Sequence, residues 1–157
     1  MIVPVTKANE EAWAELSLAL WPEVAKEELL KERALGNLVN EFLYLYNDEA
    51  VAFISLSLRF DYVEGTNTSP VAYLEGIYVK PEYRKKGIAR ALMEFTKEWA
   101  LVKGCKELAS DCELENKTSE AFHKKIGFKE ANRLICFTME LKKTIWRKID
   151  ENCSKNI

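Results

Sequence analysis

The sequence predicts one mixed α/β domain with a mixed sheet, because helix-like and strand-like segments interleave along a chain of 157 residues. That length suits one domain with a sizeable hydrophobic core and is too short for two domains of typical size. The composition, 48% hydrophobic and 31% charged, is that of an ordinary globular protein. The expected order of elements is β-α-α-β-β-β-α-β-α-β, without internal repeats or low-complexity segments.

The first part of the chain predicts a short strand followed by two helices. Residues 2–5, IVPV, are the strand candidate. Residues 9–21 carry apolar side chains near helical spacing and acidic residues in the first turn, as an amphipathic helix does. Pro22 is suited to begin a second helix and Gly36 to end it.

Three strands are predicted next. Residues 41–60 contain two strand-like runs on either side of the turn residues 47–48, an Asn-Asp pair. Residues 61–69 are a polar loop, and residues 70–79 are a further strand rich in β-branched and aromatic residues. Gly76 lies inside that strand, which predicts a β-bulge or a place where another backbone approaches closely.

The last part of the chain predicts two helices and two more strands. A long helix spans residues 84–103 and ends at Gly104, and one of its faces is expected to be buried. The apolar residues of that face are Ile88, Leu92, Phe95, Trp99 and Val102. Residues 106–112 predict a short strand, residues 115–127 a helix and residues 132–141 the final strand.

Membrane and metal functions are not expected. No apolar run approaches the roughly 20 residues of a membrane span, and the N-terminus lacks a basic-then-apolar signal. The cysteines at 105, 112, 136 and 153 form no CxxC pair and have no spaced histidine partners. Neither a zinc site nor a disulfide framework is expected, and reduced thiols fit a cytoplasmic protein.

The net charge of −2 is unevenly distributed. Residues 142–157 hold five basic and two acidic residues, a net +3, so residues 1–141 carry −5. A mildly acidic body argues against nucleic-acid binding and is compatible with cationic ligands. The basic segment 142–157 has a modest amphipathic pattern and is expected to be an extension of a domain spanning residues 1–141. It could pack on its own domain, cover a dimer surface, fray, or lie on an acidic membrane.

Three cations, Arg84 to Lys86, stand before Gly87 where the long helix begins. Helix N-termini carry about half an elementary positive charge and usually prefer acidic neighbours, so the cations indicate an anionic ligand. Free backbone N–H groups at a helix start can point at a phosphate, and Gly87 lets it approach without a Cβ in the way. The alternative is a solvated basic first turn on a surface helix.

Two motifs resemble those of the GNAT acyltransferase superfamily. The stretch RKKGIA, residues 84–89, resembles its R-x-x-G-x-G/A signature, and ENKTSEAFHKKIGF resembles its N-x-x-A/S…F-Y-x-x-x-G-F segment. The resemblance implies the GNAT fold, with acetyl-CoA in a V-shaped opening between two splayed central strands, residues 70–79 and 106–111. Pantetheine would pair with the first of these strands, and the pyrophosphate would lie on backbone N–H groups of residues 85–89. The implied cofactor-binding residues are Ile77, Tyr78, Val79, Arg84, Lys85, Lys86, Gly87, Ile88, Ala89, Asn116 and His123.

A narrower similarity concerns the acyl acceptor. The blocks LALWPE, RFDYVEGTNTSPVAYLEGIYV and KELASDCELEN are similar to those of aminoglycoside 6'-N-acetyltransferases, which are antibiotic-resistance enzymes. The resemblance implies direct transfer of acetyl to a primary amine of an aminoglycoside, and a homodimer. Trp21, Tyr62, Glu75 and Asp111 would line the acceptor site.

The carboxylates of these segments agree with a cationic acceptor. Six of them border the presumed opening: Asp61, Glu64, Glu75, Asp111, Glu113 and Glu115. Aminoglycosides are polycations, for which carboxylates and amphipathic aromatic side chains are the expected contacts.

Each residue assigned to the acceptor site could instead have a purely structural role. Glu75 could pair with a basic neighbour on the sheet, and Asp111 could only cap or turn the chain. Trp21 could be plain core, and Tyr62 could simply be exposed. Glu113 and Glu115 are more typical of a solvated loop or a helix N-terminus than of ligands.

The chemistry requires a neutral amine. A lysine-like pKa near 10.4 lies about 3.4 units above neutral pH, an obstacle of roughly 4.6 kcal/mol, so a carboxylate should accept the proton directly or through a water. Glu75 is our candidate base, and Asp111 is the second anchor or an alternative base. A backbone N–H near Ile77 could polarise the thioester carbonyl.

His123 departs from the superfamily pattern. Many members place a tyrosine that acts as general acid seven residues after the motif asparagine, and here that position holds His123. The imidazole could donate a proton to the leaving thiolate, hydrogen-bond the cofactor, or only stabilise helix packing. Cys112 has no activating base in the sequence, which argues against an acyl-enzyme.

Two rival functions remain open on the sequence. An acetyltransferase of polyamines or protein amino groups would also take cationic acceptors. A coenzyme A-binding sensor would hold the cofactor without turnover.

Overall fold

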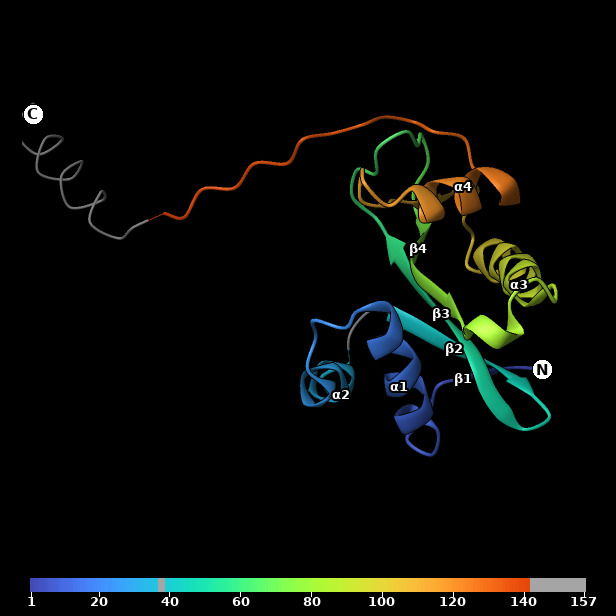
Figure 1. The fold of residues 1–157 in the computed structure, drawn as a ribbon. Coiled ribbons are helices and arrows are strands. Elements are labelled where there is room, and N and C mark those ends of the chain that lie inside the picture. The colour runs from blue at the N-terminus through green and yellow to red at the C-terminus, as the bar shows by residue number, and fades with distance from the viewer. Residues whose placement is uncertain (37–38, 142–157) are drawn as a thin grey trace, which may run out of the picture.

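The computed structural model describes residues 1–36 and 39–141 of the chain (Figure 1). The predicted basic extension, residues 142–157, lies outside the described residues. In the described part, no helix has both the length and the apolar character needed to cross a membrane.

A five-stranded sheet with the order β1-β2-β3-β4-β5 forms the centre of the molecule. The first four strands are antiparallel and β5 joins β4 in parallel, so the predicted mixed sheet is confirmed. The strands are β1 (Ile2–Pro4), β2 (Val39–Tyr46), β3 (Glu49–Arg59), β4 (Val71–Val79) and β5 (Leu108–Ser110).

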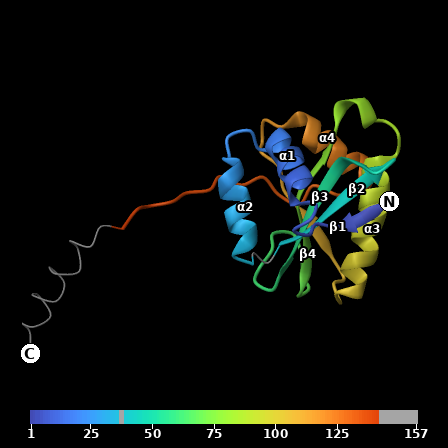
Figure 2. The ribbon, with the colours of Figure 1, turned by 90° about the horizontal axis from the view of Figure 1, so that it is seen from below.

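Helices cover both faces of the sheet. Helices α1 (Glu10–Leu20) and α2 (Lys26–Ala34) lie on one face, whereas α3 (Ile88–Val102) and α4 (Lys117–Ile126) lie on the other (Figures 1 and 2). Each layer therefore buries one face of the sheet, as the mixed α/β prediction requires.

Strand β3 separates the two halves of the core. Phe53 packs in the cluster beneath α1, and its neighbour Ile54 packs in the cluster beneath α3. Successive side chains of a strand point to opposite faces, and both of these are fully buried. Burial of a side chain of this size contributes about 1.5–3 kcal/mol relative to an exposed one.

Strand β4 contains the predicted bulge. Opposite β3, Gly76 pairs with Ser55 and Leu74 pairs with Leu56, so Glu75 is the extra residue. A Cβ at Gly76 would lie 2.6 Å from Cζ2 of Trp21. The bulge is thus confirmed, and the group that approaches closely is an indole rather than a backbone.

The edge of β4 is open over the second half of the strand. Strand β5 pairs only with Ala72 to Leu74, whereas β3 follows β4 as far as Val79. Within the described chain, residues 75–79 therefore have no strand on that side. This is the predicted splay of the central strands.

Two helices begin later than predicted. Helix α2 begins at Lys26 rather than at Pro22, and α3 begins at Ile88 rather than at Arg84, after the 3₁₀ turn η1 (Pro81–Tyr83). Left-handed residues cause the second difference, because Lys85 has φ of 60° and Gly87 has φ of 82°. A right-handed helix cannot pass through such residues.

The predicted final strand is wrong. Residues 132–141 have no regular secondary structure, and the run leaves the body of the molecule (Figure 1). A strand needs hydrogen-bond partners on a neighbouring strand, which a favourable composition does not supply. Large apolar side chains are exposed along this run, namely Leu134, Ile135, Phe137, Met139 and Leu141.

Candidate active site

The turn before α3 combines backbone donors with positive charge. Lys85 and Gly87, on either side of Lys86, adopt left-handed conformations. Such turns make successive N–H groups converge into a concave anion-binding nest. Nothing lies within 4 Å of where a Cβ of Gly87 would be, so this side of the turn is open to a ligand.

Arg84 fastens this turn to the end of β4. Its Nε donates a hydrogen bond to the carbonyl oxygen of Val79 at 2.9 Å, and its guanidinium carbon lies 5.6 Å from the ring centre of Tyr78. The nest and the open edge of β4 are thereby held next to each other. Both belong to the predicted cofactor site, and together they present N–H and C=O groups that fit an extended, phosphate-bearing ligand.

Glu75, the extra residue of the bulge, lies in a polar group of side chains on β3 and β4. The hydroxyl of Ser57 donates to its Oε1, and Nη2 of Arg59 donates to Oε1 and Oε2 at 3.0 and 3.1 Å. Glu75 therefore does pair with a basic neighbour on the sheet, which is the structural role that the sequence also allowed. Its side chain still exposes 29% of its surface, so an acceptor could reach it.

Tyr73 joins Glu75 to Asp111. The guanidinium carbon of Arg59 lies 3.3 Å from the centre of the Tyr73 ring, and the Tyr73 hydroxyl donates to Oδ1 of Asp111 at 2.6 Å. Burial, followed by this hydrogen bond, raises the pKa of Tyr73, so the hydroxyl stays protonated and remains a donor. The structure thus brings two of the sequence-predicted acceptor residues, Glu75 and Asp111, into one network.

Trp21 completes one wall beside the bulge. Its ring packs edge-on against Phe53, 5.7 Å between centres, and covers the space above Gly76. Trp21 also lines a cavity of about 160 Å³ under α2, in which burial raises the pKa of Glu41 to about 7. The cavity residues are Trp13, Trp21, Leu29, Glu32, Arg33, Val39 and Glu41. Trp21 therefore serves both as core and as a wall next to Glu75.

The loop after β3 carries Tyr62. Its side chain is 80% exposed, and its hydroxyl donates to Oε2 of Glu64 at 2.8 Å. Among the described contacts, Tyr62 is grouped with Glu64 and not with the Glu75–Asp111 network. Asp61, Glu113 and Glu115 are exposed as well.

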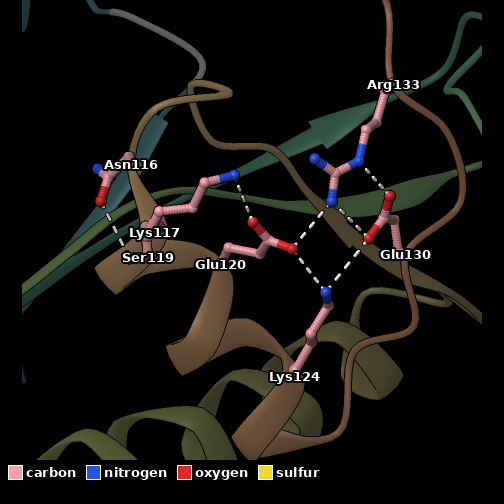
Figure 3. A network of polar contacts seen from close by, with 7 residues as sticks. All are labelled: Asn116, Lys117, Ser119, Glu120, Lys124, Glu130 and Arg133. Atoms are coloured by element: carbon pink, nitrogen blue, oxygen red, sulfur yellow. Dashed lines mark hydrogen bonds and ion pairs between the residues drawn. The ribbon is translucent and has the colours of Figure 1, made fainter.

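Asn116 directly precedes α4 and His123 lies on it, next to the end of β5. Asn116 caps the helix, since its side-chain oxygen accepts a hydrogen bond from the N–H of Ser119 (Figure 3). His123 places Nδ1 2.7 Å from the Ser119 carbonyl oxygen and Nε2 2.8 Å from Oγ of Ser110. That hydroxyl also lies 3.0 Å from the carbonyl oxygen of Leu74, at the point where β4 and β5 separate.

Four residues of this site were missed by sequence reasoning: Ser57, Arg59, Tyr73 and Ser110. A signal was present for the first three, because Ser55, Ser57 and Arg59 alternate along one face of β3, and Tyr73 and Glu75 do so along β4. Matching the two faces requires the register of the bulge, which no sequence pattern gives.

Two further features of the described part of the chain concern metal ligands and free thiols. No group of three or more His, Cys, Asp or Glu side chains there could hold a metal ion. Cys112, next to Asp111, is a free and exposed thiol.

Comparison with known proteins agrees with this geometry. The chain is 42% identical over 139 residues to the aminoglycoside N(6')-acetyltransferase type 1 of Acinetobacter genomosp. 13, a match that covers 87% of this chain and 95% of the relative. The solved structure of the aminoglycoside antibiotic 6'-N-acetyltransferase AAC(6')-IG from Acinetobacter haemolyticus matches with a TM-score of 0.85 at 35% identity. That match covers 90% of this chain and 99% of the other.

A further solved structure contains a ligand. AAC(6')-Iy in complex with the bisubstrate analog CoA-S-monomethyl-acetylneamine matches with a TM-score of 0.82 at 33% identity, over 90% of this chain and 98% of that one. The model of the acetyltransferase (GNAT) family matches residues 5–128. The match of the family model and the 42% identical relative show that this chain belongs to the acetyltransferase (GNAT) family.

Proposed function

We propose that this chain transfers acetyl from acetyl-CoA directly to the 6'-amino group of an aminoglycoside antibiotic. The observation that carries the proposal is the division of the β4 region into a basic nest with an open strand edge and an acidic, aromatic wall. The named relatives support the acceptor, since they are aminoglycoside N(6')-acetyltransferases at 33–42% identity. The bisubstrate analog bound by AAC(6')-Iy supports one shared site for cofactor and acceptor.

The cofactor would lie along the open edge of β4. Its pantetheine would follow the backbone around Ile77 to Val79, and its pyrophosphate would meet the N–H groups of residues 85–89, with the side chains of Lys85 and Lys86 adding positive charge. Acetyl-CoA supplies an acetyl group activated as a thioester. We place the reaction in the cytoplasm, a reducing compartment that the free thiols of Cys105, Cys112 and Cys136 fit.

The acceptor would lie against Trp21, Glu75 and Asp111, with Tyr62 at the rim. In the reaction a C–N bond forms and the C–S bond breaks. The ammonium loses two protons in all, of which one ends on the coenzyme A thiol and one in solvent. Glu75 is the proposed first proton acceptor, and Asp111, whose Oδ1 already accepts from Tyr73, is the proposed second anchor.

His123 is the proposed proton donor to the thiolate. A carbonyl oxygen can only accept, so the contact with Ser119 places a proton on Nδ1. The single proton of Ser110 can point to Leu74 or to Nε2. In the imidazolium form Nε2 also carries a proton, which it would give to the thiolate. The Ser110 hydroxyl then turns its hydrogen from the Leu74 carbonyl oxygen to the bare Nε2, so the imidazole keeps both of its neighbours while the Leu74 carbonyl oxygen loses this donor.

Acetylation assays with matched acceptors test the function. We expect thiol release from acetyl-CoA with kanamycin, which has a 6'-amine, and at least a hundredfold less with an aminoglycoside that has a 6'-hydroxyl instead. Spermidine and a peptide panel serve as controls for the polyamine and protein alternatives. Faster release with either control would replace the proposed acceptor, and tight acetyl-CoA binding without any release would indicate a sensor.

Glu75→Gln tests the proposed base. General base catalysis typically contributes 10²–10⁴-fold, so we expect kcat with kanamycin to fall about a hundredfold or more while the affinity for acetyl-CoA stays unchanged. The matched control is Glu94→Gln, an exposed acid of α3 that pairs with Lys97 at 2.8 Å. An unchanged kcat in Glu75→Gln would remove Glu75 from the mechanism.

Gly87→Val tests the nest. A side chain there would project into the space assigned to the pyrophosphate, so we expect KM for acetyl-CoA to rise at least tenfold with a smaller effect on KM for kanamycin. Gly104→Val is the control, because Gly104 has φ of 80° and, like Gly87, no atom within 4 Å of its added Cβ. The two variants share the backbone strain, and equal KM values in both would contradict the assignment.

We also propose that the protein is a homodimer in which the run 134–141 is covered by a second copy. Just before this run, Arg133 pairs with Glu120 and Glu130 at 2.9 and 2.6 Å (Figure 3). The pair with Glu120 links the chain to α4. Beyond that point the exposed apolar side chains would favour burial against another molecule.

Sedimentation of the full chain tests the dimer. We expect the mass of two chains at micromolar concentration, and of one chain after replacement of Ile135, Phe137 and Met139 by Ser. The control replaces Leu101 and Val102, which are 70% and 84% exposed on α3, and should remain dimeric. A monomeric wild type would contradict the proposal.

A further inference from the structure

Arg59 is placed where it competes with the acceptor for Glu75. It is the last residue of β3, and its Nη2 bridges both oxygens of the carboxylate. An amine at the same carboxylate must either approach beside this guanidinium or displace it. In both cases Arg59 reduces the attraction between Glu75 and a positive charge.

We propose that Arg59 is a positioning residue of the transfer reaction, which shares Glu75 with the acceptor and thereby keeps that carboxylate from holding the amine as an ammonium ion. The inference rests on the proposed function and deepens it. Nothing in the sequence motifs assigns a role to Arg59.

The physical reason lies in the protonation state that the reaction needs. Only the neutral amine has the lone pair that attacks the thioester, whereas a bare carboxylate next to the amine stabilises its protonated form. Stronger binding of the cation would therefore oppose the chemical step, as interactions that favour the ground state do. A guanidinium on the same carboxylate offsets this effect, since it cannot lose its own proton at any working pH.

The surroundings hold Arg59 in this role. Its guanidinium lies on the Tyr73 ring, and the side chain is 41% exposed, so it can shift when an acceptor enters. Ser57 continues to donate to Oε1 of Glu75, which leaves Oε2 as the oxygen that turns to the amine. The hydroxyl of Ser57 thus keeps the carboxylate oriented while Arg59 moves.

The charged and titratable groups of this network come from β3, β4 and the residue that follows β5. They are Arg59 from β3, Tyr73 and Glu75 from β4, and Asp111 directly after β5. On the helix side the wall is the neutral Trp21. Two carboxylates and one guanidinium give the network a net charge of −1, which becomes −2 without Arg59.

Arg59→Met tests the inference, because it keeps an unbranched apolar stem over Tyr73 and removes the charge. We expect KM for kanamycin to fall about tenfold and kcat at pH 7 to fall about tenfold. We also expect the rising limb of the kcat–pH profile to move up by about one pH unit, because one unit corresponds to a tenfold change in the neutral amine. At a pH above the pKa of the bound amine in both proteins, kcat should approach the wild-type value.

Three comparisons separate this role from a merely structural one. Arg59→Lys keeps the charge and should keep the pH midpoint within about 0.3 units of wild type. The Ki of a 6'-hydroxyl aminoglycoside should change less than twofold in Arg59→Met, because a hydroxyl brings no positive charge to Glu75. Lys97→Met, an exposed cation of α3, should behave as wild type. If Arg59→Met does not fold by circular dichroism, Arg59→Gln provides the same test.

The possible failures are distinguishable. A wild-type protein that does not acetylate kanamycin would overturn the proposed function and the inference with it. A wild type that is active, with an Arg59→Met variant whose pH midpoint is unchanged or whose KM for kanamycin rises, would overturn the inference alone.

Discussion

The bulge at Glu75 and Gly76 is the constraint on which the site depends. It inserts one residue into β4 opposite β3, and it places a carboxylate and a residue without a side chain next to each other. The carboxylate meets Ser57 and Arg59, and the missing side chain leaves room for the indole of Trp21. In a strand without the bulge, neighbouring residues would face opposite sides of the sheet and these contacts could not share one wall.

The same strand separates two kinds of charge. Toward its C-terminal end β4 leads into the basic nest at residues 85–87, and at the bulge it carries Glu75. The open edge between them is produced by the early end of β5, since its pairing stops at Leu74. A single strand thus carries or leads into both of the regions proposed for binding, and the distance between them is set by backbone geometry rather than by flexible side chains.

Periodic parts of the fold were predictable from the sequence, and parts that depend on partners were not. The strand pair around Asn47 and Asp48 follows from local patterns and is confirmed. The predicted buried face of α3 is confirmed only in part, because Ile88 and Leu92 are buried whereas Val102, in the last turn, is 84% exposed. The predicted start of α3 is too early, because the left-handed turn at Lys85 does not change the spacing of the apolar residues. The strand predicted at 132–141 has the right composition, but composition does not provide a neighbouring strand.

The short pairing of β5 with β4 also affects how the two halves of the domain hold together. Only three residue pairs, from Ala72 with Leu108 to Leu74 with Ser110, form this parallel seam. Where the seam ends, the hydroxyl of Ser110 contacts the carbonyl oxygen of Leu74 and the imidazole of His123, and the hydroxyl of Tyr73 donates to Asp111. A ligand that contacted both β4 and α4 at this point would add links across a short seam, and its binding would then also stiffen the domain.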